Sequence, residues 1–285
     1  MICFPNAKIN LGLRVLRKRP DGYHDIETVF FPIPLSDILE LVGSSAFSEG
    51  TPLSLPSGHK LFYSSSGNDF ISNPISDLTV KACVAFDHSF GIDSDIVLHI
   101  HKNIPSGAGL GGGSSDAAHA LISLNSIHGN KVGQSDLLHL ASTLGSDCPF
   151  FIVNKPCHAL GRGEQLIPID FDLKGYHLLL VKPPMGVSTA EAYGAVKPID
   201  DPSIPSLVEI VKQPVELWPS LLKNDFETGV FQRHPELAAI KSKLYDMGAS
   251  YAAMSGSGST MYGLFSYKPE HGSSFENCFT FLCEL

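Results

Sequence analysis

A glycine-rich segment is the part of the chain whose residue types most directly indicate chemistry. Residues 104–115 read IPSGAGLGGGSS, and the only bulky side chain in the glycine run is Leu110. Backbone N–H groups of such a loop can converge on phosphate, and a helix starting directly after it adds roughly half a unit of positive charge. A flexible linker would also be rich in glycine, but it would not lead into a capped helix. The residues predicted to bind nucleotide phosphate are Pro105, Ser106, Gly107, Ala108, Gly109, Leu110, Gly111, Gly112, Gly113, Ser114 and Ser115.

Two known phosphate-binding motifs compete for this segment. Gly107, Gly109 and Gly112 satisfy the GxGxxG pattern of dinucleotide-binding oxidoreductases. That fold needs a series of strand–helix crossovers, which the strand-rich opening and the Pro-rich stretch from residue 197 to 219 do not indicate. A Walker loop needs a lysine before its Ser or Thr, and Gly113 is followed directly by Ser114. Neither motif accounts for the loop.

A lysine and an aspartate elsewhere in the chain could act on a transferred phosphoryl group. A strand period of two places Asn6, Lys8 and Asn10 on one face, where the ammonium could stabilise negative charge. A solvent-facing strand edge would show the same alternation. Asp147 precedes the apolar residues 149–151, so its carboxylate could accept or orient a hydroxyl proton. An ordinary aspartate that caps a turn is the alternative there.

The elements that would position these residues follow from periodicity and caps. Residues 4–33 predict two strands around the turn at Pro20–Gly22, and residues 43–76 predict a loop-rich excursion. Further along, alternation predicts a strand at 95–101, and caps with apolar spacing predict helices at 76–91, 114–128 and 135–145, beginning at serines 76, 114 and 135.

After Asp147 the pattern changes to strands. Residues 149–169 and 176–184 predict strands and turns, residues 235–248 a helix, and residues 250–265 strands around the glycine–serine turn 255–259. That turn is expected either to close over the phosphates or the substrate chain, or to be a plain hairpin. We place a domain boundary near 155–170 and expect two α+β domains.

Composition limits the functional class. The 285 residues are 43% hydrophobic and 17% charged, with a net charge of −9, which excludes a disordered chain and disfavours general nucleic-acid or anionic-membrane binding. Six cysteines without a CxxC pair indicate reduced thiols, and no segment has the roughly 20 apolar residues of a membrane span, so we expect a cytoplasmic protein. His99 and His101 share a strand face, but no third ligand is spaced to complete a metal site.

Several segments together resemble one enzyme family. The sequence PSGAGLGGGSSDAA resembles the phosphate-binding motif of the GHMP kinases, and five further segments match a branch of that family: AKINLGL, PDGYH, GSDCPFF, NDFE at 224–227 and MSGSGST at 254–260. The resemblance spans residues 6–260. It implies an α+β fold of two domains, a ribosomal-protein-S5-like domain at 1–160 and a ferredoxin-like domain at 161–285, with ATP bound between them.

The resemblance also implies roles for single residues. In the matching branch ATP phosphorylates a hydroxyl of a cytidyl-linked sugar alcohol, so Lys8 and Asp147 would be catalytic. The implied substrate-binding residues are Asn10, Tyr23, His24, Thr189 and Tyr193, with Tyr193 at a position where the family usually carries Phe. Mg²⁺ would be held mainly by ATP oxygens and water, with a hydroxyl from Ser114 or Ser115 and no protein-only metal site. A family member acting on mevalonate or homoserine, and an inactive nucleotide-binding module, are the alternatives.

Overall fold

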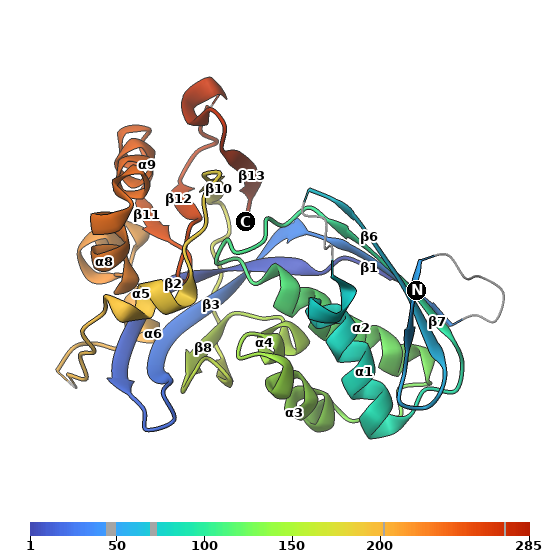
Figure 1. The fold of residues 1–285 in the computed structure, drawn as a ribbon. Helices are drawn as coiled ribbons and strands as arrows, with labels where there is room; N and C mark the ends of the chain where they lie inside the picture. Colours follow the sequence, from blue (N-terminus) through green and yellow to red (C-terminus); the bar gives the residue numbers. More distant parts are fainter. Residues whose placement is uncertain (44–49, 69–72, 202, 271) are drawn as a thin grey trace. The chain divides into compact units, whose positions relative to one another are not determined.

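The computed structural model describes residues 1–43, 50–68, 73–201, 203–270 and 272–285, in two compact units (Figure 1). The first unit comprises Met1–Ala7, Pro34–Ser106 and Gly111–Asn154. The second comprises Lys8–Ile33, Gly107–Leu110 and Lys155–Leu285. Both units are therefore discontinuous in sequence, whereas the predicted division at 160/161 is a single cut. That division into two domains stays a prediction.

The first unit contains a five-stranded sheet with helices on one face (Figure 1). The sheet order is β1 (Ile2–Cys3), β4 (Ile38–Gly43), β7 (Ile96–Lys102), β6 (Lys60–Gly67) and β5 (Thr51–Ser54). The helices are η1 (Pro74–Ser76), α1 (Leu78–Phe90), α2 (Gly112–Ile127), α3 (Gln134–Leu144) and α4 (Cys148–Val153). Only the β6–β7 ladder is parallel among the described strand pairs. This topology is not that of a doubly wound dinucleotide fold.

The inward face of this sheet follows from the alternation in β7. Ile96, Leu98 and Ile100 are buried against α1 and α2, and Lys102 continues the same register. Helix α1 begins after Asp77, whose side chain accepts the Thr79 N–H, and it ends at Gly91 with a φ of +77°. The predicted strand at 95–101 is confirmed, and the glycine loop follows it in the chain.

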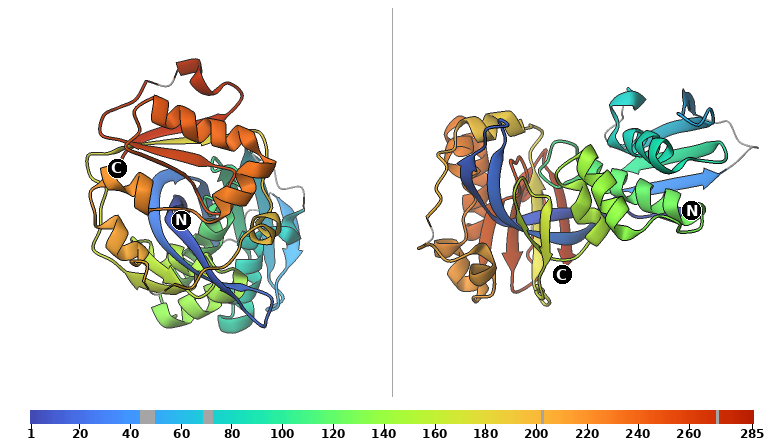
Figure 2. Two further views of the ribbon diagram at one scale, coloured as in Figure 1. Left: turned by 90° about the vertical axis from the view of Figure 1, so that its left-hand side faces the viewer. Right: turned by 90° about the horizontal axis from the view of Figure 1, so that it is seen from below.

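The second unit contains two four-stranded sheets. One has the order β2 (Asn6–Lys18), β3 (His24–Ser36), β8 (Cys157–Leu160) and β9 (Gln165–Pro168). The other, antiparallel throughout its described ladders, has the order β11 (Tyr251–Met254), β12 (Met261–Phe265), β10 (His177–Lys182) and β13 (Phe279–Glu284). The helices are α5 (Thr189–Gly194), α6 (Leu207–Val211), η2 (Val215–Leu217), α7 (Trp218–Leu221), α8 (Phe226–Arg233), α9 (Pro235–Asp246) and η3 (Gly272–Phe275). Figure 2 shows α9 lying against β11 and β12.

Two predicted elements are wrong. Residues 51–54 and 60–67 are strands β5 and β6, so the excursion predicted at 43–76 is a loop over only part of its length, and residues 44–49 lie outside the described part. The apolar run after Asp147 forms helix α4 and no strand. A short apolar run does not distinguish the two by periodicity. Asp147 at the helix start, Pro149 in the first turn and Asn154 at a φ of +49° favour the helix.

Three helix starts also differ from the prediction by one or two residues. Helix α2 begins at Gly112 after Gly111, without the predicted serine cap, and α3 begins at Gln134 after Gly133. Helix α1 is capped by Asp77 in place of Ser76. Strands β2, β3 and β8 to β12 and helix α9 lie close to their predicted positions, whereas β4, β13 and helices α5 to α8 were not predicted. The predicted α+β class is confirmed.

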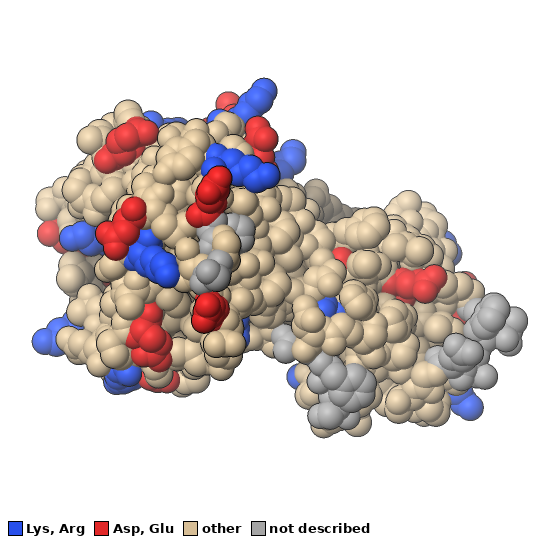
Figure 3. Space-filling model, turned by 90° about the horizontal axis from the view of Figure 1, so that it is seen from above, with Lys and Arg blue, Asp and Glu red and all other residues tan. Residues whose placement is uncertain are grey.

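The charged side chains are mixed in sign. On the face seen in Figure 3, acidic and basic side chains of the described residues are interspersed, and neither sign covers a continuous area there. Within the described ranges, no helix combines the length and apolarity needed to cross a membrane.

Candidate active site

The glycine loop has the geometry of a phosphate cradle. It connects β7 to α2, and Gly107, Gly109 and Gly111 have φ values of +59°, +73° and +74°. Residues with a Cβ rarely adopt this left-handed conformation, so three glycines are needed here. Because α2 begins at Gly112 and runs for 16 residues, the N–H groups of its first turn have no partner within the helix. The predicted arrangement of strand, loop and helix is confirmed.

Lys8 lies against this loop within the second unit. Its side chain is buried with 3% exposure, and Nζ donates hydrogen bonds to the Asn10 Oδ1 at 2.6 Å and the Gly109 carbonyl at 3.0 Å. The Lys8 backbone N–H also donates to the Leu110 carbonyl at 3.0 Å. The alternative of a solvent-facing strand edge is therefore wrong. The Lys8 ammonium is therefore held beside the part of the loop where we expect phosphate.

Hydrogen bonds with Thr28 and Tyr262 fix the orientation of Asn10. Its Nδ2 donates to the Thr28 Oγ1 at 2.9 Å, and the Thr28 hydroxyl donates to the Gly12 carbonyl at 2.6 Å. The Tyr262 hydroxyl donates to the Asn10 backbone carbonyl at 2.8 Å. Since the amide nitrogen of Asn10 is taken by Thr28, its oxygen faces Lys8. This arrangement fixes the direction in which the Lys8 ammonium points.

The second glycine–serine turn also contacts the loop within the second unit. Ser255 Oγ donates to the Gly109 carbonyl at 2.8 Å, and the Thr260 N–H donates to the Ala108 carbonyl at 3.2 Å. A Cβ at Gly109 would overlap the Ser255 carbonyl oxygen, so only glycine permits this approach. The turn connects β11 to β12 as a hairpin would, and in addition it packs on the glycine loop.

A buried ion cluster lies under the start of α2 in the first unit. Lys102 Nζ donates to Asp37 Oδ2 and to Asp116 Oδ2, and all three side chains are buried. The second oxygen of Asp37 accepts the N–H groups of Asn103 and Ile104 at 2.6 and 2.7 Å. A Cβ on Gly112 would lie 3.6 Å from Lys102 Nζ. The cluster therefore ties the end of β7 to the first turns of α2.

Burial and the opposite charges of the cluster act against each other on its pKa values. It raises the pKa of the Asp116 carboxyl well above its ordinary value, although the Lys102 ammonium opposes the shift. For Lys102, burial lowers the pKa, but the attraction of Asp116 and Asp37 outweighs it and the net shift is upward. Sequence analysis missed this cluster. A lysine in the inward register of β7 was the available signal, because an inward charge needs buried partners.

Asp147 stands at the start of α4 in the first unit, and its side chain is half-buried. Burial raises the pKa of the neighbouring Cys148 thiol to about 11, and the Asp147 charge adds to that shift. Lys8 belongs to the second unit, so the pairing of Lys8 with Asp147 stays a prediction.

The predicted cytidine-binding residues lie in the second unit, and two of them touch. The His24 ring stacks on the Tyr193 ring, with centroids 4.7 Å apart and planes 16° apart. Burial, together with the charge of Lys18, lowers the pKa of His24. The imidazole is therefore neutral near pH 7, with one donor and one acceptor nitrogen. Thr189 Oγ1 lies 3.3 Å from Ser257 Oγ, next to the second glycine–serine turn.

Two further residues contact the predicted cytidine-binding residues, and sequence analysis assigned neither of them to the site. The Arg162 guanidinium lies 4.9 Å above the Tyr23 ring, which is 55% exposed. Phe226 packs edge-on against Tyr193 with centroids 4.8 Å apart. Because His24 already covers one face of Tyr193, a base can reach that face only by taking the place of the His24 ring. The stacking of cytosine on Tyr193 stays a prediction.

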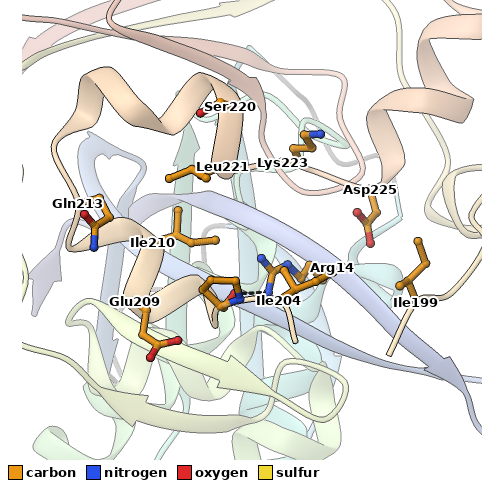
Figure 4. A pocket seen from close by; sticks show the side chains of 11 residues that line it. Arg14, Ile199, Ile204, Glu209, Ile210, Gln213, Ser220, Leu221, Lys223 and Asp225 are labelled. Atoms are coloured by element: carbon orange, nitrogen blue, oxygen red, sulfur yellow. Dashed lines mark hydrogen bonds between the residues drawn. The ribbon is translucent and has the colours of Figure 1, made fainter. Parts of the chain in front are cut away.

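A separate pocket of about 500 Å³ lies elsewhere in the second unit (Figure 4). Its walls are mainly apolar and include Ile204, Ile210 and Leu221, while Arg14 donates to the Pro205 carbonyl at 2.7 Å. No predicted site residue lines this pocket. We therefore do not place the active site there.

A magnesium ion held mainly by ATP oxygens and water stays a prediction. Among the described residues, no group of three His, Cys, Asp or Glu side chains could hold a metal ion. Mg²⁺ in kinases takes few protein ligands and relies on phosphate oxygens and water. Of the two predicted hydroxyl donors, Ser115 is fully buried and Ser114 is half-buried. Ser114 is therefore the residue that could reach such an ion.

Models of two protein families match the chain. The model described as GHMP kinases N terminal domain matches residues 77–155, and the model described as GHMP kinases C terminal matches residues 206–275. The first match includes the whole glycine loop and Asp147. The second includes the NDFE segment and the second glycine–serine turn.

Curated relatives align over nearly the whole chain. A 4-diphosphocytidyl-2-C-methyl-D-erythritol kinase from Parabacteroides distasonis is 48% identical, covering 98% of this chain and 97% of that protein. The protein of the same name from Bacteroides thetaiotaomicron is 47% identical over 93% of this chain and 92% of its own length. A crystal structure of 4-(cytidine 5'-diphospho)-2C-methyl-D-erythritol kinase is 29% identical, with a TM-score of 0.76 and full coverage of both chains. The Methanococcus jannaschii mevalonate kinase, at 16% identity and a TM-score of 0.65, shares the fold.

Proposed function

The chain belongs to the GHMP kinase family, and on that premise we propose that it phosphorylates the 2-hydroxyl of 4-diphosphocytidyl-2-C-methyl-D-erythritol with ATP, a step in non-mevalonate isoprenoid biosynthesis. The observation that carries the proposal is the Lys8 ammonium, which is buried and bonded to the Gly109 carbonyl of the phosphate loop. Relatives nearly half identical over the full chain carry the name of this kinase.

The reaction exchanges one phosphorus–oxygen bond for another. The substrate 2-hydroxyl oxygen forms a bond to the γ-phosphorus of ATP, and the bond from that phosphorus to the β,γ-bridging oxygen breaks. ADP leaves with that electron pair, and the hydroxyl proton passes to the Asp147 carboxylate and then to solvent. Since the transition state of phosphoryl transfer is loose, Asp147 would orient the hydroxyl before it accepts the proton. Its half-buried position before α4 supports this role.

Electrostatic stabilisation would come from the loop and from Lys8. Backbone N–H groups of residues 107–113 and the first turn of α2 would donate to the phosphates. Lys8 would offset the charge that develops on the γ-phosphoryl oxygens. Because Asn10 and Gly109 already hold its ammonium, little reorganisation is needed when the phosphate arrives. Mg²⁺, held by phosphate oxygens, water and the Ser114 hydroxyl, would supply further neutralisation of the phosphate charge.

The cytidyl end would bind among Tyr23, His24 and Tyr193. A neutral His24 offers the donor and acceptor that a cytosine edge requires, and the two tyrosine rings offer faces for stacking. Thr189, beside Ser257, would support the same pocket. We place the enzyme in the cytoplasm, since its six cysteines are all unpaired thiols.

A paired-substrate assay tests this function. Purified protein is incubated with ATP and Mg²⁺ and with the cytidyl substrate, mevalonate or homoserine in separate reactions, and ADP release is followed. We expect turnover with the cytidyl substrate alone. Turnover with mevalonate or homoserine alone would refute the proposed substrate, and no turnover with any of the three would leave an inactive nucleotide-binding module as the better interpretation.

A further inference from the structure

The NDFE segment, residues 224–227, is shared with the family but has no part in the reaction described above. We infer that Asn224 is a positioning residue that holds the second glycine–serine turn, and through it the phosphate loop, in the geometry that binds ATP. The inference rests on the proposed function in that ATP is taken as the ligand of the loop.

Asn224 is buried with 3% exposure, and its side-chain amide makes three hydrogen bonds to described residues. Its Nδ2 donates to the carbonyls of Met254 and Gly256, both at 2.8 Å, and its Oδ1 accepts the Phe226 N–H at 3.0 Å. Two donors on one nitrogen, aimed at two carbonyls on either side of Ser255, require a primary amide. An aspartate in this position would have almost the same shape and no such donors.

The neighbours of Asn224 fix its position. Glu227 Oε1 accepts the Met254 N–H at 2.8 Å, so Met254 is held at its N–H by Glu227 and at its carbonyl by Asn224. Asp225 points the other way. It lines the pocket in Figure 4, and its Oδ2 accepts the Val15 N–H of β2 at 2.8 Å. Residues 224–227 therefore hydrogen-bond on one side to Met254 and to the second glycine–serine turn, and on the other side to β2, the strand that carries Lys8.

The second glycine–serine turn is in turn hydrogen-bonded to the phosphate loop. Ser255, which lies between the two carbonyls bound by Asn224, donates its hydroxyl to the Gly109 carbonyl at 2.8 Å. The same carbonyl accepts Lys8 Nζ at 3.0 Å. A Cβ on Gly256 would lie 3.4 Å from Asn10 Oδ1 and 3.3 Å from the Gly109 carbonyl oxygen, so the turn has little room to shift. A turn released by loss of Asn224 would therefore disturb Gly109 and Lys8 together.

The test compares two buried asparagines. Asn224→Asp removes both donors, and Asn125→Asp makes the same change at another buried asparagine, whose Nδ2 donates to the Val132 carbonyl at 3.0 Å at the far end of α2. For both variants we measure melting temperature, the Kd of a non-hydrolysable ATP analogue, and kcat and KM with the cytidyl substrate. We expect the analogue Kd of Asn224→Asp to rise at least tenfold and KM for ATP to rise more than KM for the cytidyl substrate. Asn125→Asp should lose stability with less than a threefold change in Kd.

The possible outcomes separate the two proposals. If folded Asn224→Asp binds the analogue within twofold of the unchanged protein, or if Asn125→Asp weakens binding equally, Asn224 has only a structural role and the inference fails. If Asn224→Asp does not fold, Ser255→Ala decides: a Kd raised at least threefold supports the inference, and an unchanged Kd overturns it. If the unchanged protein binds the analogue but does not phosphorylate the cytidyl substrate, the proposed function fails while this inference stands.

Discussion

Replacing Lys102 by methionine tests whether the buried cluster beneath α2 determines the stability of the first unit. The substitution keeps the length of the side chain but leaves Asp37 and Asp116, both almost fully buried, without their shared cation. Breaking a buried pair in this way costs about 3–5 kcal/mol of unfolding free energy. With a denaturant slope of about 2–3 kcal/mol/M, the urea midpoint falls by roughly 1–2.5 M.

A matched change at the partner should behave differently. Asp116→Asn keeps an oxygen to accept from Lys102 and removes a carboxylate whose charged form burial disfavours. Asp116 Oδ1 has no hydrogen-bond partner among the described residues, so the amide nitrogen that replaces it buries unpaired donors, at a cost of about 1–3 kcal/mol. Lys102→Met should still be the more destabilising of the two substitutions, because it leaves buried carboxylates without their cation.

The pH dependence of stability gives a second readout with a defined sign. Because the folded-state pKa of Asp116 lies above its ordinary value of 3.8, the folded protein retains a proton that the unfolded chain has lost. The contribution of Asp116 is therefore fully present below about pH 4 and is lost as pH rises through the folded-state pKa, at up to 1.36 kcal/mol per pH unit. Asp116→Asn lacks this titration, so its stability relative to the unchanged protein should improve from pH 4 to pH 8.

Urea unfolding followed by circular dichroism at several pH values measures both effects. A loss below about 1 kcal/mol for Lys102→Met would show that the cluster is solvated or rearranges, because an uncompensated buried charge costs more than that. Parallel pH profiles for Asp116→Asn and the unchanged protein would refute the raised pKa.

Three further predictions concern the proposed reaction. Asp147→Asn should bind ATP and the cytidyl substrate normally but lose about 10²–10⁴-fold in kcat, and near-normal turnover would remove Asp147 from the reaction. Gly111→Val, at a φ of +74°, should raise KM for ATP at least tenfold. The control Gly58→Val is also in the left-handed region, at +91°, but has open space around it and should leave KM for ATP unchanged. Equal effects of the two substitutions would make backbone strain the sole cause. Tyr193→Ala should raise KM for the cytidyl substrate about five- to a hundredfold, because it removes stacking of ~1–3 kcal/mol, and it should leave ATP affinity unchanged. Tyr193→Phe should have almost no effect on either KM. Equal weakening of both substrates by Tyr193→Ala would place Tyr193 outside the cytidine pocket.

The parts of the site that could be predicted from sequence are those encoded by neighbouring residues. The glycine loop is recognisable because left-handed φ values and close backbone approach demand glycine, and Gly107, Gly109 and Gly111 meet that demand. The strand before it follows from the alternation in β7, and the helix after it follows from its apolar spacing, although the predicted serine cap is not used. Residue type and hydrophobic period are therefore enough to predict local geometry of this kind.

The parts that were missed depend on contacts between distant segments. Helix α4 was predicted as a strand because a six-residue apolar run has no usable period, and only its end residues distinguish the two. The face of β2 with Lys8 looked equally like a solvent-facing edge, because alternation does not reveal what covers a strand. The contact partner of Lys8, the Gly109 carbonyl, is 101 residues away.

Buried polar side chains link these distant segments, and they follow a common rule. A polar group in the interior must be hydrogen-bonded. Each of four buried polar side chains meets this requirement through a specific partner: Lys8, Asn10, Lys102 and Asn224. Lys8 and Asn224 donate to carbonyls of the glycine loop and of the second glycine–serine turn. Asn10 and Lys102 act one step away, because Asn10 accepts from Lys8 and Lys102 donates to Asp37, which accepts the Ile104 N–H. Removing one member therefore costs more than its own bond, because the remaining partner is left buried and unpaired. For this reason substitutions at these positions should disturb ATP binding even where the side chain itself cannot touch the nucleotide.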